Sequence, residues 1–187
     1  MTELLSPAVL VAGLLVLLGW QSSGFRAVGL LHGLIAGLFE SVLPFAYILN
    51  GVRTGKLTDH HIGVRQQRRG PLLVGVGSVV AGFGLLVALG ASRQLLAAVV
   101  AGGVGLVVAA GVSHWWKMSI HTAVAGGTAA ILALVFSPAP LVFCAALPLV
   151  ALVGWSRIRL GDHTLAQVLV GSVVGMAVAG AVFGLLR

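Results

Sequence analysis

Long apolar runs separated by short polar segments make up almost the whole chain of 187 residues. A membrane-spanning helix needs about 20 apolar residues, within a range of roughly 17 to 25. Five runs approach this length, at about residues 4–20, 28–49, 71–91, 95–112 and 164–186. A further uncharged run at 118–156 is too long for one span, and a Ser-Pro-Ala-Pro breaker at 137–140 divides it into two helices. The pattern predicts six or seven spans, because the first run is short.

Composition supports lipid as the solvent of this chain. Hydrophobic residues make up 59% of it, charged residues only 8%, and the mean hydropathy is +1.11. Soluble domains are nearer a quarter charged. Inside lipid every backbone polar group must be satisfied internally, which leaves helices or a closed barrel. Barrel strands alternate in polarity, whereas these runs are unbroken Leu, Val, Ala and Gly. We therefore predict an all-α, polytopic transmembrane helical bundle forming a single domain over residues 1–187.

Glycines recur at a spacing of four in the last predicted span. Gly171 and Gly175 form one such pair, and Gly180 and Gly184 form another. Small residues at this spacing lie on one helix face and allow two helix backbones to approach closely. We interpret both pairs as packing glycines.

The polar segments at 50–70, 114–117 and 157–163 are separated from one another by two predicted helices each. An even number of spans returns the chain to the same face, so all three segments are predicted to meet on one side of the membrane. That side receives eight of the 11 Lys and Arg residues. Such a cluster is typical of an anion site, since Arg and Lys are fixed donors to phosphate oxygens and histidine transfers protons near neutral pH. Positive loops that merely mark the cytoplasmic side explain the charge pattern equally well.

Three short motifs lie in these segments. Residues Arg65 to Pro71 lie at the end of the first polar segment, and Lys117 to His121 begin at the last residue of the second. The third segment is preceded by Ser156 and runs from Arg157 to His163, six residues later. In order and spacing they resemble the three signatures of the type 2 phosphatidic acid phosphatase (PAP2) family, Lys-x6-Arg-Pro, Pro-Ser-Gly-His and Ser-Arg-x5-His-x3-Asp. The resemblance covers residues 50–187 as a PAP2-like core, and residues 1–49 are predicted to add N-terminal spans.

The motifs depart from the family pattern at several positions. Gln167 stands where the family has Asp, Met118 replaces Pro and Ile120 replaces Gly. The first motif is approximate, because no lysine precedes its arginines at the family spacing. A Gln carbonyl can accept a hydrogen bond from a histidine ring, but it cannot stabilise an imidazolium as a carboxylate does.

The resemblance implies a role for each matching residue. His163 is implied as the nucleophile that forms a phosphohistidine, His121 as the general acid and Gln167 as the residue that orients His163. Asp162 is expected to point elsewhere, as a neighbour on the same helix. The residues implied to bind the phosphoryl oxygens are Arg157, Ser119, Lys117 and one or two of Arg65, Arg68 and Arg69.

The function implied by the resemblance is hydrolysis of a lipid phosphate monoester or diphosphate, with a polyprenyl or glycerophospholipid tail, by a multi-pass enzyme of the cell membrane. We predict no cofactor and no metal, because the pair His60-His61 has no further ligand at metal-binding spacing. Lipid phosphate and membrane lipids are the expected partners. Nucleic acid is not, because the chain lacks a basic stripe with interleaved aromatic residues.

Two alternatives and one question of orientation stay open. The alternatives to an active phosphatase are a weak or inactive PAP2-like protein that binds lipid headgroups or a partner, and a small transporter that uses Glu40 and His32. Both residues lie inside a predicted span, where ionisable groups are costly and often functional. The positive-inside rule places the motif face in the cytoplasm. The family resemblance more often implies an extracytoplasmic site, which we slightly favour.

Overall fold

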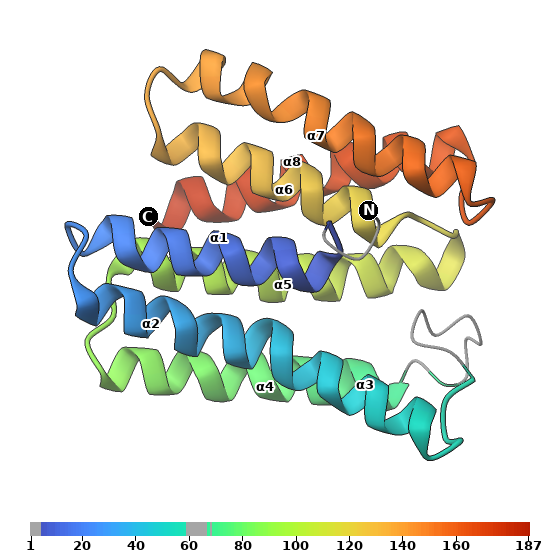
Figure 1. Cartoon of the computed structure of the whole chain (residues 1–187), viewed down its shortest axis with the longest axis horizontal. Helices are drawn as coiled ribbons and strands as arrows, with labels where there is room; N and C mark the ends of the chain where they lie inside the picture. Colours follow the sequence, from blue (N-terminus) through green and yellow to red (C-terminus); the bar gives the residue numbers. More distant parts are fainter. Residues whose placement is uncertain (1–4, 59–66, 68) are drawn as a thin grey trace.

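A computed structural model describes residues 5–58, 67 and 69–187, and this part of the chain is helical without any strand. A continuous helix comprises α2, the π-helical turn η1 and α3, so the labelled elements form seven helical rods (Figure 1). Their bounds are α1 (Pro7–Ser22), α2 (Ala27–Gly37), η1 (Leu38–Val42), α3 (Leu43–Arg53), α4 (Arg69–Ala88), α5 (Arg93–Trp115), α6 (Ile120–Val135), α7 (Ala139–Arg159) and α8 (Leu165–Leu186).

The predicted transmembrane bundle is confirmed. Within the described ranges, five helices are long and apolar enough to cross a membrane: the rod Ala27–Arg53, α4, α5, α7 and α8. The remaining two, α1 and α6, are apolar but have 16 residues each. At 1.5 Å per residue they extend about 24 Å, less than the ~30 Å hydrocarbon core. Both lie alongside the longer helices in Figure 1.

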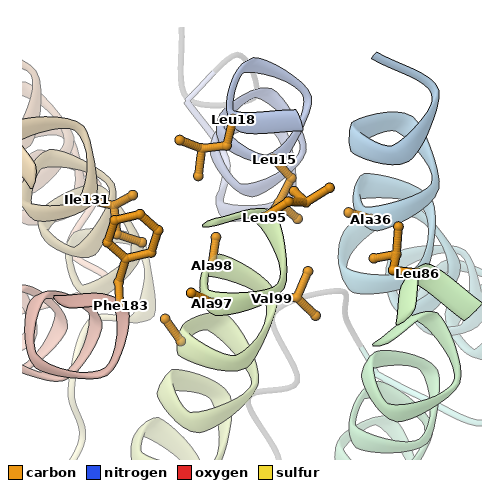
Figure 2. Packing of buried hydrophobic residues seen from close by; sticks show 11 residues of the cluster. Leu15, Leu18, Ala36, Leu86, Leu95, Ala97, Ala98, Val99, Ile131 and Phe183 are labelled. Carbon is orange, nitrogen blue, oxygen red and sulfur yellow. The ribbon is translucent and has the colours of Figure 1, made fainter. Parts of the chain in front are cut away.

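The bundle is organised around α6 and α5. Helix α6 packs most extensively against α8 and also against α7 and α1, whereas α5 contacts α8, α4 and α1. Figure 2 shows Phe183 of α8 beside Ile131 of α6, with both facing the small side chains of Ala97 and Ala98 on α5. Phe183 is fully buried, so it anchors the centre of this apolar core.

The described parts of the three polar segments lie at one end of the bundle. The end of α3, the α5–α6 linker and the α7–α8 loop are all at the right of Figure 1, opposite the C-terminus. At the other end, arginines donate to exposed carbonyls at helix ends. Arg93 Nε donates to Leu186 O at 2.8 Å, and Arg187 donates to Leu134 O. This use of arginine is usual for helix C-termini, so the charges available for other chemistry are at the motif end.

Candidate active site

A tight loop joins α7 to α8 and brings the third motif together. Gly161 has a φ of +72°, which a residue with a side chain rarely adopts, and it turns the chain back on itself. The backbone N–H groups of Asp162 and His163 both donate to Arg157 O, at 3.1 and 3.3 Å. The loop is therefore folded onto the last turn of α7, with the Arg157 and His163 backbones in direct contact.

His163 is oriented by Gln167. Its Nδ1 lies 3.1 Å from Gln167 Oε1, and the backbone N–H of Thr164 donates to the same Oε1 at 3.2 Å. Because a backbone N–H can only donate, this Gln167 atom is the carbonyl oxygen, an acceptor. The His163 Nδ1 must then carry the proton, which leaves the lone pair on Nε2. The predicted contact between these two residues is confirmed.

Two cations converge on Asp162. Arg157 is 3% exposed, and its Nη1 lies 3.4 Å from Asp162 Oδ2. Lys117 Nζ, from the α5–α6 linker, donates to the backbone oxygen of Asp162 at 2.6 Å. The expectation that Asp162 lies on a helix is wrong, whereas its carboxylate does point elsewhere, to Arg157. Helix α8 begins only at Leu165 with Thr164 as N-cap, so Asp162 belongs to the turn and not to the helix.

The electrostatics of His163 follow from these neighbours. Burial lowers its pKa below the ordinary value for histidine, and the positive charges of Lys117 and Arg157 lower it further. The hydrogen bond to Gln167 and the negative charge of Asp162 oppose this shift. The net effect is a ring that stays neutral at a pH where an exposed histidine is partly protonated. Such a ring is a competent nucleophile near neutral pH.

The second motif, at the start of α6, packs against the first turn of α8, which follows the third motif. Ser119 is fully buried as the N-cap of α6, where its Oγ accepts from the N–H of Thr122 at 3.4 Å. Its own N–H donates to Gln167 O at 3.2 Å, and Thr122 Oγ1 lies 3.0 Å from Val168 O. These bonds fix the start of α6 against the first turn of α8. The hydroxyl implied to contact phosphate thus serves as a helix cap in this structure.

Close approach of α6 and α8 depends on glycine. A Cβ at Gly171 would lie 2.5 Å from Ser119 O and 2.6 Å from Thr122 Oγ1, and one at Gly175 would overlap the backbone of Ala123. The interpretation of this pair as packing glycines is confirmed. Gly180 and Gly184 differ, because a Cβ there would make ordinary contacts at 3.6 and 3.8 Å.

His121 lines a small cavity of about 40 Å³ between α6 and α7. Arg157 and Ser156 line the same cavity, so residues of the second and third motifs share one space. The rest of its lining is apolar: Leu5, Leu152, Val153 and Trp155. Trp155 is largely exposed on the outer surface of α7. The cavity therefore has both polar lining from the motifs and apolar lining that includes a residue of the outer surface of α7.

The departures from the family pattern leave this arrangement intact. Met118 is 3% exposed and packs inside the bundle, whereas Ile120 is 47% exposed and directs its side chain outward. Neither side chain lines the cavity that Arg157 and His121 share. Ile120 replaces a glycine at the first position of α6, and its backbone there is helical, a conformation that any residue adopts.

The first motif is not joined to the other two by any described contact. Arg69 is exposed at the start of α4, whose main packing partners are α2, η1, α3 and α5. Arg65 and Arg68 lie outside the described residues. The cluster that the structure assembles thus consists of His163, Gln167, Arg157, Asp162 and Lys117, with His121 and Ser119 adjoining it.

Glu40 and His32 lie away from this cluster. Glu40 is in the π-helical turn η1 and abuts Gly102 of α5, and its Oε2 is buried without a hydrogen-bond partner. His32 is eight residues earlier, about 12 Å along the helix axis, so the two side chains do not pair. Serines support the turn: Ser78 donates to Phe39 O at 2.5 Å, and Ser41 donates to Ala8 O at 2.7 Å.

Sequence reasoning missed three residues of the site. Asp162 bonds Arg157, Thr122 joins α6 to α8, and Thr164 forms a capping box with Gln167. The capping box had a readable signal, because Thr-x-x-Gln at a helix start is its usual pattern. Thr122 had none, since its role depends on the distance between two helices that are far apart in the sequence.

Comparison with known families gives one match. The family model described as the PAP2 superfamily matches residues 27–187, which includes every helix from α2 onward. No curated protein and no solved structure matches the chain.

Proposed function

The chain belongs to the PAP2 superfamily, and from this premise we propose that it is a membrane lipid phosphatase acting through a phosphohistidine on His163. Members of this superfamily are usually phosphatases, and the apolar helices point to a membrane phosphatase. The substrate is a phosphate monoester or diphosphate of a lipid, with a polyprenyl or glycerophospholipid tail. The headgroup would enter the polar end of the bundle while the tail remained in lipid.

In the proposed reaction, the lone pair on His163 Nε2 attacks the terminal phosphorus. The bond that breaks joins this phosphorus to the lipid oxygen in a monoester, or to the bridging oxygen in a diphosphate. His121 protonates that oxygen as it leaves. Water then attacks the phosphohistidine, gives up its proton to His121, and releases phosphate while His163 is restored. The sum is hydrolysis of one phosphate ester by one water. General acid help of this kind contributes on the order of 10²–10⁴ in rate.

The observation that supports this proposal best is the environment of His163. Its Nδ1 is engaged by Gln167 Oε1 at 3.1 Å, so the free lone pair is on Nε2. Arg157 and Lys117 lie close enough to lower its pKa. A phosphoryl group in transfer spreads charge over three oxygens, so positioned cations carry most of the catalysis. Arg157 and Lys117 are the proposed donors, with Ser119 and the arginines Arg65, Arg68 and Arg69 as additional ones.

The test is phosphate release by the purified protein in detergent. A panel of lipid phosphates and diphosphates is assayed with excess chelator, and His163→Ala is compared with His114→Ala, a histidine at the same end of the bundle. We expect release from at least one lipid, unaffected by chelator, abolished in His163→Ala and retained in His114→Ala. Unchanged release by His163→Ala would refute the assigned nucleophile. Absence of release by a folded wild-type protein would instead favour a PAP2-like protein that only binds lipid headgroups.

We place the site on the extracytoplasmic face of the cell membrane, on the family resemblance. The chain has one cysteine, Cys144, which permits a clean labelling test. In a Cys144→Ala background, Leu160→Cys puts a thiol on an exposed residue of the α7–α8 loop. Reaction with a membrane-impermeant maleimide on intact cells is expected. Labelling only after the cells are opened would place the loop in the cytoplasm.

A second candidate function, proton-coupled transport, rests on Glu40. An ionisable residue inside a span is often functional, and π-helical turns frequently occur at functional sites. The unpartnered Oε2 in η1 combines both features. Proton flux into liposomes that is lost in Glu40→Gln and retained in His163→Ala would support transport. Flux equal to that of empty liposomes would remove this candidate.

A further inference from the structure

Negative charge is scarce in this protein. The chain has four acidic residues, Glu3, Glu40, Asp59 and Asp162. Within the described ranges, Asp162 is the one carboxylate side chain outside the membrane-spanning helices. It lies in the loop that carries the proposed nucleophile, next to His163 in sequence. The position of this single charge among several cations calls for a chemical reason.

The contacts of Asp162 join the two cations of the site, Arg157 and Lys117. Its carboxylate meets the buried guanidinium of Arg157 at 3.4 Å, and its backbone oxygen accepts from Lys117 Nζ at 2.6 Å. Its backbone N–H donates to Arg157 O at 3.1 Å. The side chain is 42% exposed, so the carboxylate lies at the mouth of the site and not below it. A phosphoryl group bound by Arg157 would have this carboxylate as a close neighbour.

The residue bonded directly to His163 has no charge to offer. Gln167 accepts the Nδ1 proton and so fixes the tautomer, but an amide oxygen carries only a partial charge. When Nε2 bonds to phosphorus and Nδ1 keeps its proton, the ring becomes positively charged. That charge develops beside Arg157 and Lys117, both of which oppose it. Apart from the phosphoryl oxygens themselves, Asp162 is the one anion that the loop contains.

We propose that Asp162 is a positioning residue that supplies the negative charge of this site, so that Gln167 orients His163 while Asp162 offsets the positive charge that the ring gains on phosphorylation. The inference rests on the proposed phosphatase function. The charged or titratable groups on the surrounding elements are Lys117 after α5, His114 at the end of α5, His121 on α6, and Arg157 and Arg159 on α7. All of them are basic, so no other described side chain can serve.

The experiment compares Asp162→Asn, Asp162→Glu and Asp162→Asn combined with Gln167→Glu. The last change keeps the length of the side chain and the capping box, and it places a carboxylate on the atom that bonds His163. Arg159→Gln is the matched control, because Arg159 also ends α7 but stacks over Trp155 at 5.9 Å. The titration of His163 is followed by NMR of ¹⁵N-histidine protein in detergent, assigned by the resonance missing in His163→Ala. Phosphate release and inhibition by inorganic phosphate are measured in parallel.

We expect Asp162→Asn to move the His163 titration to lower pH, because the change removes a negative charge that opposes the lowering of this pKa. We expect kcat to fall on the order of tenfold, since solvent screens a charge acting across an exposed loop. Asp162→Glu and the combined variant should return the His163 titration toward its wild-type position. Both should also bring kcat to within about threefold of wild type. Arg159→Gln should leave the titration where it is in the wild-type protein.

Two results would overturn the inference. One is a His163 titration that Asp162→Asn does not move. The other is a loss of kcat in Asp162→Asn that the added Gln167→Glu change fails to recover, together with a changed affinity for inorganic phosphate. That result would mean that Asp162 only holds Arg157 in place. Because the NMR titration needs no turnover, it tests the charge even when no lipid is hydrolysed. If neither the wild-type protein nor any variant releases phosphate, the proposed function is refuted. The titration result then decides this inference.

Discussion

A single methyl group at Gly171 is expected to disable the site without touching His163, Gln167 or Arg157. Gly171 is on α8, two turns below His163, where the helix crosses the start of α6. The Cβ of an alanine would lie 2.5 Å from Ser119 O and 2.6 Å from Thr122 Oγ1. Neither atom can withdraw, because Ser119 caps α6 and Thr122 is fully buried against α8. The two helices must therefore separate.

The size of the effect follows from that separation. Ordinary contact begins near 3.4 Å, so α6 and α8 must move apart by about 0.9 Å. This movement stretches the bonds from Ser119 N to Gln167 O and from Thr122 Oγ1 to Val168 O, which are already 3.2 and 3.0 Å long. Overpacking of this kind costs typically 1–3 kcal/mol. A displacement of about 1 Å between reacting groups costs on the order of 10²-fold in rate.

The assay compares Gly171→Ala with Gly180→Ala and Gly184→Ala on the same helix, where an added methyl makes ordinary contacts. We expect kcat/KM for lipid phosphate to fall about 100-fold in Gly171→Ala and to stay near wild type in both controls. Circular dichroism and thermal unfolding in detergent report whether the bundle is retained. A folded Gly171→Ala protein with activity within threefold of wild type would refute the claim that the α6–α8 contact positions the site.

Two further predictions use the surroundings of the site. His163 acts unprotonated, and burial lowers its pKa below the ordinary histidine value of about 6.5. On the acidic side, kcat/KM should therefore be lost only as the pH falls through a value below about 6.5. An acidic limb of kcat/KM at or above about 6.5 contradicts this prediction. Trp155 lines the cavity shared with His121 and Arg157, whereas Trp115 lines a separate groove of about 370 Å³ between α4 and α5. Trp155→Ala should raise KM about tenfold for a long-chain lipid phosphate, because lost apolar contact costs ~1–2 kcal/mol. KM for a short-chain soluble phosphate should not change. An equal effect of Trp115→Ala would reject the proposal that the lipid tail lies along the Trp155 cavity.

The helices and their topology could be predicted because lipid imposes one rule on every span. Each must be apolar, long and hydrogen-bonded within itself, so the pattern of runs and breaks carries the architecture. The turn at 137–140 was readable from its prolines, and α6 and α7 are separated there. The even number of spans between polar segments then required them to share one end. Nothing in that argument needed distances between helices.

The site could be predicted where its contacts are local. His163 and Gln167 are four residues apart, and their hydrogen bond forms across the N-cap of α8 and not within the helix. Asp162 escaped the same reasoning because the helix was assumed to start too early. Thr164 is the N-cap, so the residues before it follow the geometry of a glycine turn. Ser119 and Thr122 depend on how closely α6 approaches α8, a distance set by side-chain volume across the whole interface.

Gln167 illustrates how one substitution divides a task between two residues. A carboxylate bonded to a histidine ring fixes its tautomer and also offsets its positive charge. The amide of Gln167 retains the first effect, and the capping box strengthens it, because Oε1 accepts from Thr164 N as well as facing Nδ1. Turning the amide over would place its NH₂ group against a backbone donor, so the orientation is held by the helix cap itself. The second effect requires a charge from elsewhere, and the turn that begins α8 provides it in Asp162. In this proposal, the loop's own anion lets His163 remain a working nucleophile although Gln replaces the motif carboxylate.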